Sequence, residues 1–430
     1  MNLFQDHIYL ILWPLAPLFA LFPRAETFLV IQGVFAALAA LPLYAIGLQY
    51  APKAKWVAAS LPLLYWLYLP TRNGNAFDFH PDLLMLLFGF TAIAGFQGLG
   101  WRSRALGALG LLGVLACKES SGVVVTGLGI AWALGAAPER SRAFCRRLGL
   151  ALIPLGVAWF WLETKWVPAY FFGGTYHYSK AYAGFEPGLG GILLAPFQNP
   201  ALFFERLVAP SRLRFLFFTI GGLAFLPLLH WRAAVAAVPA YLMLFLSSGD
   251  HRVSLYYYYG TEASIALFWA LPTGMLRASA WWAARRPRKL PVYAFAAWVL
   301  FWSLGLSGRS EMYRIRVHEP SERATWFRTR LVPCVDREVP LSATSSLVPH
   351  LGERHWAVAL PHLAGPSGGS VECVIEDSQA GAWPLAPATR TELVKGLIQD
   401  GFRAVYQCQS VQVLQRNSRC LECTPECFTP

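Results

Sequence analysis

The chain has 430 residues, of which 56% are hydrophobic and only 14% are charged. An ordinary soluble domain carries about 45–50% apolar and about 25% charged residues, so this composition argues against a soluble protein and predicts a multi-span membrane protein. The formal net charge of +12 does not indicate a nucleic-acid partner. Lys and Arg gather in short loops between apolar runs and form no basic groove.

Apolar runs recur along residues 26–307, and about ten of them reach, or nearly reach, the length that crosses about 30 Å of hydrocarbon. We expect spans near residues 26–48, 55–70, 82–98, 104–117, 121–136, 148–168, 213–230, 233–247, 257–276 and 291–307. The stretch 104–136 counts as two of these spans, because a single helix of that length would be about 48 Å long. The two spans meet at Lys118-Glu119-Ser120.

Positive charges fall in every second connection between these runs, and the positive-inside rule places such connections in the cytoplasm. They hold Lys53, Lys55, Arg102, Arg104, Arg140, Arg142, Arg146, Arg147, Arg232, Arg277, Arg285, Arg286, Arg288 and Lys289. The other connections then face the outer side of the membrane, which we expect to be a bacterial inner membrane. They are the loop NGNAFDFHPD at residues 73–82, the Lys118-Glu119 tip, 169–212, 249–260 and everything after about residue 308.

The first residues do not fit a simple span. Residues 8–22 are apolar but short, and Pro14 and Pro17 interrupt them. Counting them as a span would place Asp6 and His7 in the cytoplasm, and no signal peptide precedes this pair. We therefore expect residues 8–22 to form a pair of short helices that lie in the outer interface.

The sequence changes character near residue 308, which divides it into a polytopic transmembrane domain, 1–307, and an extracytoplasmic domain, 308–430. In the second part long apolar runs vanish and strand-like segments alternate with helical ones, which predicts a small α/β domain. The strand-like segments are VPLSAT, HWAVALP, VECVIED, RAVYQC and SVQVLQ, and the helical ones are SLVPHLG and TRTELVKGLIQDGF. The expected fold class is thus a membrane all-α bundle with a small C-terminal α/β domain.

Six of the eight cysteines lie in this tail: Cys334, Cys373, Cys408, Cys420, Cys423 and Cys427. An even number on the outer side of a membrane predicts disulfides, whose pairing stays open. The alternative is a metal site at Cys420, Cys423 and Cys427. Disulfides are the preferred interpretation, because the tail holds a single CxxC pattern and no histidine follows it.

The outer loop NGNAFDFHPD, residues 73–82, places two acids and a histidine beside the hydrocarbon. Ionisable groups at that depth are costly unless they are solvated or paired, so they indicate a functional site. We take Asp78 and His80 as candidate catalytic residues and Asp82 as a candidate substrate-binding residue. The alternatives are that Asp78 is simply solvated and that Asp82, which follows Pro81, caps the next helix.

Two further charged pairs lie on the same predicted side. Asp6 and His7 are candidate catalytic residues, because a carboxylate ahead of an interfacial helix suits a general base toward a hydroxyl acceptor. A solvated chain terminus is the alternative for this pair. Lys118 and Glu119 interrupt an apolar hairpin and are either a binding group for phosphate or a structural ion pair.

The segment GDHRVSLYYYYG, residues 249–260, contributes Arg252, whose planar guanidinium matches phosphate oxygens. His251 and Tyr257 join it as candidate substrate-binding residues, although consecutive tyrosines are also typical of the aromatic belt at a membrane interface. The chain contains no P-loop, dinucleotide fingerprint, HExxH or serine-elbow pattern, so a soluble nucleotide is not an obvious substrate.

From residue 6 onward, nearly the whole chain resembles a widespread family of prokaryotic integral membrane proteins catalogued as a domain of unknown function. The resemblance rests on Asp6-His7 before the apolar stretch with prolines, FHPD at 79–82, KES at 118–120, NPALFFERL…FLPLL at 199–229 and VPLSATSSLVPHLGERHWAVALP at 339–361. The family's usual Lys-Glu-Asp is Lys-Glu-Ser here, so no role of its third acid carries over.

The opening pattern also resembles the C-type-fold (GT-C) glycosyltransferases, which take sugars from polyprenyl-phosphate carriers. The resemblance implies a GT-C-like bundle in which Asp6 is the catalytic acid of the first outer loop and residues 8–22 are the interfacial helices. The initial span of those enzymes is missing here, which puts the activity of the chain in question.

The leading hypothesis is therefore a membrane glycosyltransferase that moves a sugar from a polyprenyl-phosphate donor to an outer-face acceptor. Asp6 would act as general base, while Lys118 and Arg252 would neutralise the departing phosphate.

Asp78, His80 or Asp82 would serve as supporting acid, hydrogen-bonding or metal-binding groups, and the participation of a divalent metal stays open. The alternatives to transfer are a transporter and a non-catalytic lipid-binding or scaffold protein. The transporter ranks lower, because the polar groups cluster at loops and no internal repeat is evident.

Overall fold

A computed structural model describes residues 7–172, 181–185, 189–285, 297–298, 301, 321–352, 354, 356–365, 368–380 and 387–428. The chain divides into two compact units. The helical unit comprises residues 2–17 and 28–314, and the C-terminal unit comprises residues 18–27 and 315–430 together with Met1.

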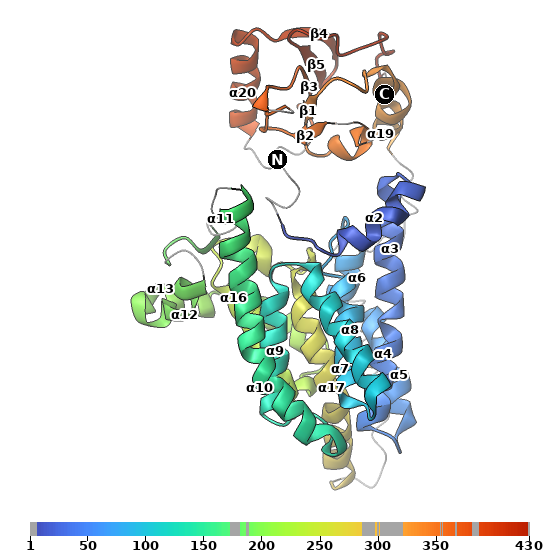
Figure 1. The fold of residues 1–430 in the computed structure, drawn as a ribbon, viewed down its shortest axis with the longest axis vertical. Helices are drawn as coiled ribbons and strands as arrows, with labels where there is room; N and C mark the ends of the chain where they lie inside the picture. Colours follow the sequence, from blue (N-terminus) through green and yellow to red (C-terminus); the bar gives the residue numbers. More distant parts are fainter. Residues whose placement is uncertain are drawn as a thin grey trace. The chain divides into compact units, whose positions relative to one another are not determined.

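Helices that run back and forth make up the helical unit (Figure 1). The α-helices of the N-terminal half of the chain are α2 (Leu12–Leu21), α3 (Ala25–Leu38), α4 (Ala40–Tyr50), α5 (Lys55–Leu67), α6 (Leu69–Ala76), α7 (Leu84–Gln97), α8 (Trp101–Cys117), α9 (Ser121–Ala133), α10 (Glu139–Trp161) and α11 (Val167–Phe172). A π-helical turn, Leu162–Trp166, joins the last two. The helices that follow are α12 (Leu189–Gln198), α13 (Pro200–Val208), α14 (Pro210–Gly221), α15 (Trp231–Ala234), α16 (Val238–Phe245) and α17 (Thr261–Ala283).

Short 3₁₀ turns connect several of these later helices, and they cover Leu226–His230, Val235–Ala237, Asp250–Val253 and Tyr258–Gly260. The first two form one continuous helical stretch, Leu226–Phe245, together with α15 and α16.

Three helical stretches within the described residues are long and apolar enough to cross a bilayer: Glu26–Tyr50, Glu139–Phe171 and Leu226–Phe245. Helix α7, with 14 residues, is apolar but reaches only about 21 Å at 1.5 Å per residue, less than the hydrocarbon thickness of about 30 Å. The expected helical membrane architecture is confirmed, whereas the count of about ten spans stays a prediction. The expected span at 291–307 lies largely outside the described residues.

The prediction that 104–136 forms two helices is confirmed, because α8 ends at Cys117 and α9 begins at Ser121. The prediction of a pair of short helices at 8–22 is wrong, since this stretch forms the single helix α2. Pro14 lies in the first turn of α2, where the backbone N–H would lack an intrahelical partner in any case, and Pro17 lies inside the helix without ending it.

The expected span at 213–230 is also broken. Helix α14 ends at Gly221, and the next helical stretch starts only at Leu226. Between them Ala224 and Phe225 adopt φ angles of 53° and 57°, in the left-handed region that no helix continues through. The sequence does not reveal this turn, because both residues are apolar and neither is a glycine, the residue that usually marks a left-handed conformation.

Small residues let neighbouring helices of the helical unit approach closely. A Cβ atom on Gly122 of α9 would lie 2.4 Å from the carbonyl oxygen of Gly156 in α10, and one on Gly156 would lie 2.4 Å from that of Gly122. Such contacts are typical of helix pairs in membranes, where close packing rather than water exclusion drives association.

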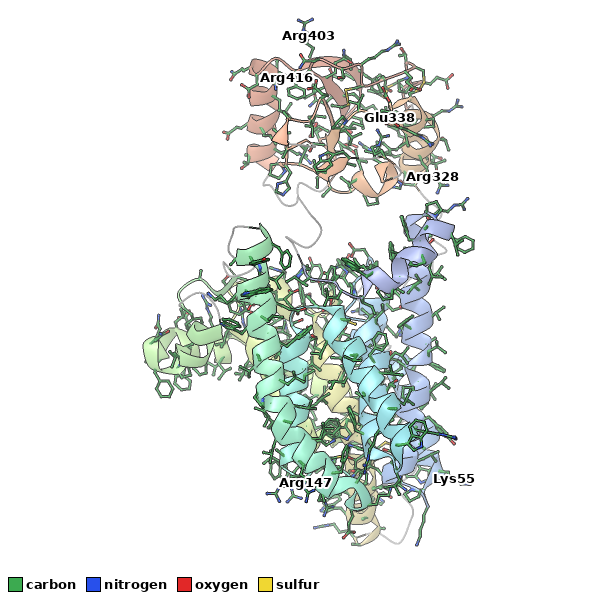
Figure 2. All side chains as sticks on the ribbon, in the orientation of Figure 1. Lys55, Arg147, Arg328, Glu338, Arg403 and Arg416 are labelled. Atoms are coloured by element: carbon green, nitrogen blue, oxygen red, sulfur yellow. A yellow bond between two sulfur atoms is a disulfide. The ribbon has the colours of Figure 1, made fainter. Side chains whose placement is uncertain are left out.

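The positive-inside rule predicts that the basic connections lie at one end of the helical unit. Figure 2 shows Lys55 and Arg147 near the same end, while α6 and α11 lie toward the opposite end in Figure 1. The compartment that each end faces remains a prediction.

The C-terminal unit contains one five-stranded sheet with the order β2-β1-β3-β5-β4. All five strand-like segments of the sequence contribute to it, as β1 (Leu341–Ala343), β2 (Ala357–Ala359), β3 (Cys373–Asp377), β4 (Arg403–Cys408) and β5 (Val411–Gln415). Strand β1 is parallel to β2 and β3, and β5 is antiparallel to β3 and β4. Helix α20 (Pro387–Gln399) precedes β4, and α19 (Glu322–Trp326) precedes β1, so the predicted α/β character is confirmed.

Three disulfides cross-link the C-terminal unit, and they confirm the preferred interpretation of the cysteines. The pairs are Cys334–Cys423, Cys373–Cys420 and Cys408–Cys427. Cys373 lies in β3 and Cys408 in β4, so two of the three bridges tie the C-terminal segment directly to strands.

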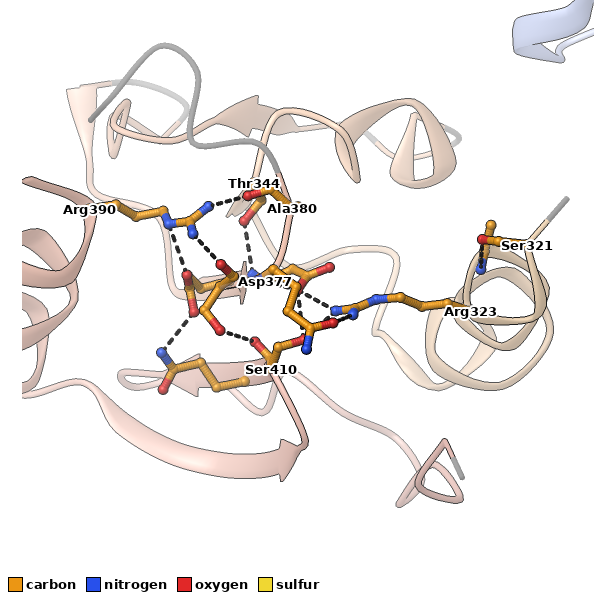
Figure 3. Close-up of polar contacts among 12 residues, drawn as sticks. Ser321, Arg323, Thr344, Asp377, Ala380, Arg390 and Ser410 are labelled. Carbon is orange, nitrogen blue, oxygen red and sulfur yellow. Dashed lines mark hydrogen bonds and ion pairs between the residues drawn. The ribbon is translucent and has the colours of Figure 1, made fainter. Parts of the chain in front are cut away.

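Buried charges at the end of β3 link the helices of the C-terminal unit to its sheet (Figure 3). Arg323 of α19 donates to the Asp377 carboxylate, which also accepts a hydrogen bond of 2.9 Å from the Ser410 hydroxyl. Arg390 of α20 lies 3.2 Å from the Glu376 carboxylate. We interpret this network as structural, because every member is paired with another part of the same small domain.

Candidate functional site

A cavity lined by charged side chains lies within the helical unit. Its volume is about 630 Å³ when the opening to solvent is included. Apart from tyrosines, the ionisable residues that line it are His7, Asp82, Lys118, Glu119, Arg252 and Glu262. The rest of the wall is formed by Ser120, Phe160, Tyr182, Met243, Leu244, Tyr258 and Tyr259. Segments from both ends of the helical unit's sequence thus converge on one site.

Lys118 and Asp82 form a buried ion pair in this cavity. The Lys118 Nζ atom lies 3.1 Å and 3.4 Å from the two Asp82 carboxylate oxygens. Lys118 adopts an extended conformation that ends α8, which directs the chain into the turn before α9. Burial alone would lower the pKa of the Lys118 ammonium, but the carboxylates of Asp82, Glu119 and Glu262, together with Tyr9, outweigh it, so this pKa lies above its ordinary value. The site therefore holds a fixed positive charge.

Glu119, the next residue, binds the N-terminal segment. Its carboxylate lies 2.8 Å from His7 Nδ1 and accepts a longer hydrogen bond, 3.4 Å, from the backbone N–H of Ile8. The backbone N–H of Ile11 donates to the Ala116 carbonyl oxygen at 2.7 Å. These contacts fix the start of the chain beside the turn that carries Lys118.

Ser120 completes the KES motif by donating a hydrogen bond to Glu262, at the start of α17. Both side chains are buried. Ser120 therefore pairs with a carboxylate that an acid at this position would repel.

His80 lies beside the cavity rather than in its wall. Its ring stacks on Tyr258, with 3.7 Å between the ring centroids, and the Lys118 ammonium lies 5.2 Å from the centroid of the same tyrosine ring. The Gln32 side chain accepts a 2.7 Å hydrogen bond from the His80 backbone N–H. Burial lowers the pKa of the His80 imidazole, against the opposing effect of the Asp82 carboxylate.

The remaining predicted residues lie in different surroundings. Asp78 has a side chain that is 73% exposed and lies 3.6 Å from His80 Nδ1. Arg252 lines the cavity, whereas His251 and Tyr257 do not. Their rings contact each other at 6.3 Å between centroids. Asp6 lies outside the described residues.

Five of the predicted residues, His7, Asp82, Lys118, Glu119 and Arg252, thus meet in one cavity. The interpretation of Asp82 as a helix cap is not what the structure shows, because its carboxylate binds Lys118 and α7 has no side-chain cap. Among the described residues, no group of three or more His, Cys, Asp or Glu side chains is arranged to hold a metal ion.

Sequence reasoning missed Glu262, Ser120 and Tyr258. Glu262 is a lone acid in the apolar run TEASIALF, and the principle that singled out Lys118 applies equally to it. Glu163 has the same signal, because it is a buried acid in the π-helical turn after α10. Neither acid stands in a recognisable motif, and both lie within apolar runs that predict membrane spans.

The sequence was then compared with known proteins. The family model described as "Predicted membrane protein (DUF2079)" matches residues 1–413. The chain belongs to this family. No curated protein and no solved structure matches it. Membership confirms the expected likeness to a family of membrane proteins of unknown function and fits a location in a lipid bilayer, while the likeness to GT-C enzymes remains a prediction.

Proposed function

We propose that the protein is a membrane glycosyltransferase that moves a sugar from a polyprenyl-phosphate donor to an acceptor at the outer face of a bacterial inner membrane. The observation that carries this proposal is the cavity in which two cations, Lys118 and Arg252, stand beside three carboxylates. Phosphate oxygens favour the cations, and sugar hydroxyls favour the carboxylates. A lipid-linked donor explains such a cavity in a membrane domain that lacks any nucleotide-binding motif.

In this mechanism the acceptor hydroxyl attacks the anomeric carbon of the sugar. The bond between that carbon and the phosphate oxygen breaks, and polyprenyl phosphate leaves with the electron pair. Lys118 and Arg252 neutralise the charge that develops on the phosphate. The proton of the acceptor passes to Asp6, the general base that the GT-C resemblance implies.

The paired residues of the cavity support this chemistry by position. Glu119 binds His7 and so fixes the segment that follows Asp6 in the sequence. Asp82 holds the Lys118 ammonium in place, and this ammonium retains further N–H donors for a phosphate oxygen. Glu262 is held by Ser120 on another wall of the cavity, where its carboxylate would accept hydrogen bonds from the donor sugar.

The test is label transfer in membranes that contain polyprenyl-phosphate sugars with a radioactive sugar. Lys118→Met, Arg252→Gln and Asp6→Asn should each lower transfer by about 100-fold or more, the usual effect of removing one group that stabilises a transition state. Lys55→Gln, which removes an exposed cation at the other end of the helical unit, is the matched control and should transfer normally.

Two outcomes would overturn the proposal. One is the absence of transfer by the wild-type protein, and also by a chain extended upstream, with every sugar carrier offered. The other is transfer that survives all three substitutions. Substrate flux across vesicles without transfer would favour the transporter instead.

A further inference from the structure

A second cavity lies in the helical unit, where α4 ends and α10 begins. Its volume is about 840 Å³ with its opening included. Tyr50, the last residue of α4, forms part of its wall, and the residues between α9 and α10 form another part. Arg147, on the first turns of α10, marks this end of the helical unit in Figure 2.

Three arginines line this second cavity: Arg142 of α10, Arg232 of α15 and Arg277 of α17. No carboxylate lines it among the described residues, and no ion pair between described residues involves any of the three. Arginines from three separate helices that share one cavity repel one another, so an anion between them would stabilise the arrangement.

Two of these guanidinium groups are held in place by the protein. Arg277 donates to the backbone carbonyl oxygen of Leu229, and the Arg232 guanidinium lies 5.6 Å from the centroid of the Trp231 ring. A guanidinium whose position is already fixed loses less conformational entropy when it binds a ligand.

His230 supplies an independent sign of a ligand. It lines the cavity, is only 7% exposed, and its Nδ1 atom has no hydrogen-bond partner. A buried polar atom without a partner costs free energy, and such atoms in a native structure call for an explanation. A phosphate oxygen in the cavity would accept a hydrogen bond from this atom in the tautomer that carries its proton there.

The surroundings indicate where the phosphate comes from. Leu228, Leu229 and Trp231, on the same turn as His230, are exposed apolar side chains. Exposed apolar and aromatic residues next to a basic pocket at the ends of membrane helices suit a lipid, whose head group occupies the pocket while its acyl chains lie along the helices.

We propose that this second cavity, lined by Arg142, Arg232, Arg277 and His230, is a binding site for the phosphate group of an anionic phospholipid. The guanidinium forks would hold the phosphate oxygens in the geometry that arginine favours. The site is separate from the cavity of Lys118 and does not depend on the proposed transferase activity.

The test is thermal unfolding of the purified full chain in detergent, with and without added lipid. Phosphatidylglycerol should raise the melting temperature by about 3 °C or more at saturation, because a ligand that binds only the folded state stabilises it. Phosphatidylcholine of the same chain length should not. Arg142→Gln/Arg277→Gln should lose this shift, and so should His230→Phe, which removes the unpaired nitrogen but no arginine.

The matched control is Arg146→Gln/Arg147→Gln, which removes two exposed arginines of the same helix end that do not line the cavity and should keep the full shift. Each variant is compared with itself in the absence of lipid, so a change in basal stability does not obscure the result. If the control loses the shift as well, or if phosphatidylcholine acts equally, the proposal is wrong. Inorganic phosphate or glycerol phosphate acting as strongly as phosphatidylglycerol would replace the lipid with a soluble phosphate ester.

Discussion

At the scale of single residues, Lys118 and Asp82 form a buried ion pair in the first cavity. Two charges taken out of water stabilise a protein only when they stay together, since either one alone retains its full desolvation cost. The acids of the FDFHPD loop therefore differ in role: Asp82 is buried against Lys118, whereas Asp78 is exposed to solvent.

Asp82→Asn should thus lower the free energy of unfolding by roughly 3–5 kcal/mol, because it leaves the Lys118 ammonium buried without its nearest carboxylate. Asp78→Asn removes an equal charge from the same loop and should change stability by no more than about 0.5 kcal/mol. Unfolding in mixed micelles measures both. Equal effects of the two substitutions would show that the ion pair is absent.

His80 makes the stability of the folded protein depend on pH. Burial lowers the pKa of its imidazole in the folded state, so between that pKa and the ordinary value of about 6.5 the unfolded chain binds more protons. Stability contributed by neutral His80 is then complete above about pH 6.5 and is lost as the pH falls below it. The difference in melting temperature between wild type and His80→Gln, followed from pH 8 to pH 5, should shrink toward acid. A difference that stays constant with pH would contradict this account.

The sequence identified the charged residues of the cavity better than it identified the residues that contact them. Lys118, Glu119 and Arg252 stood out because a charge in an apolar run must have a reason. The sequence could not show that Tyr258 and Tyr259, rather than Tyr257, line the cavity, since four consecutive tyrosines carry the same signal. Nor could it show that Glu262 pairs with Ser120, because that contact spans 142 positions.

At the scale of elements, the helical unit depends on close contacts between helices. Gly156 of α10 and Gly122 of α9 allow the two backbones to touch, whereas a Cβ atom on Gly33 of α3 would have nothing within 4 Å. Gly156 and Gly33 both lie within apolar helices, so the sequence does not show which of them is at a helix contact. Only the packing of the helices distinguishes these two glycines.

Gly156→Ala should therefore destabilise the protein by roughly 1–3 kcal/mol, because its methyl group has no room and the helices must separate. Gly33→Ala is the matched change and should be neutral or stabilising by up to about 1 kcal/mol, since alanine favours a helix. Melting temperatures of the two variants in the same detergent provide the comparison. A loss of stability for Gly33→Ala as large as that for Gly156→Ala would contradict the packing argument.

Elements were predictable where local pattern decides them. The five strands of the C-terminal unit were predicted from the sequence, because short strand-like runs bounded by turn residues are a local signal. The break after Gly221 was not predicted, because the left-handed backbone conformation of Ala224 and Phe225 is set by tertiary packing rather than by the propensity of these residues. The two prolines misled the prediction for α2, since Pro14 lies in the first turn, where a proline is tolerated, and the helix continues through Pro17.

At the scale of the whole molecule, the cysteines divide by location. Cys117 and Cys145 are buried free thiols in the helical unit, while the six cysteines of the C-terminal unit pair with one another. This division fits a chain whose C-terminal unit folds in an oxidising compartment.

Maleimide labelling followed by mass spectrometry tests the division. Of the 8 cysteines in the chain, we expect none to react in the native protein, and only Cys117 and Cys145 to react after denaturation without a reductant. All should react after reduction. Labelling of the C-terminal cysteines in unreduced, denatured protein would contradict the three disulfides.

The central claim is that His7, Asp82, Lys118, Glu119, Arg252 and Glu262 form one cavity that binds a lipid-linked sugar phosphate. The most direct measurement is equilibrium binding of a radioactive polyprenyl-phosphate sugar to the purified protein. We predict that Lys118→Met and Arg252→Gln each weaken binding at least about 10-fold, as the loss of a charge-assisted hydrogen bond of roughly 1.5–3 kcal/mol implies, and that Lys55→Gln binds like the wild type. Equal affinity of all four proteins, or no binding by any of them, would contradict the account.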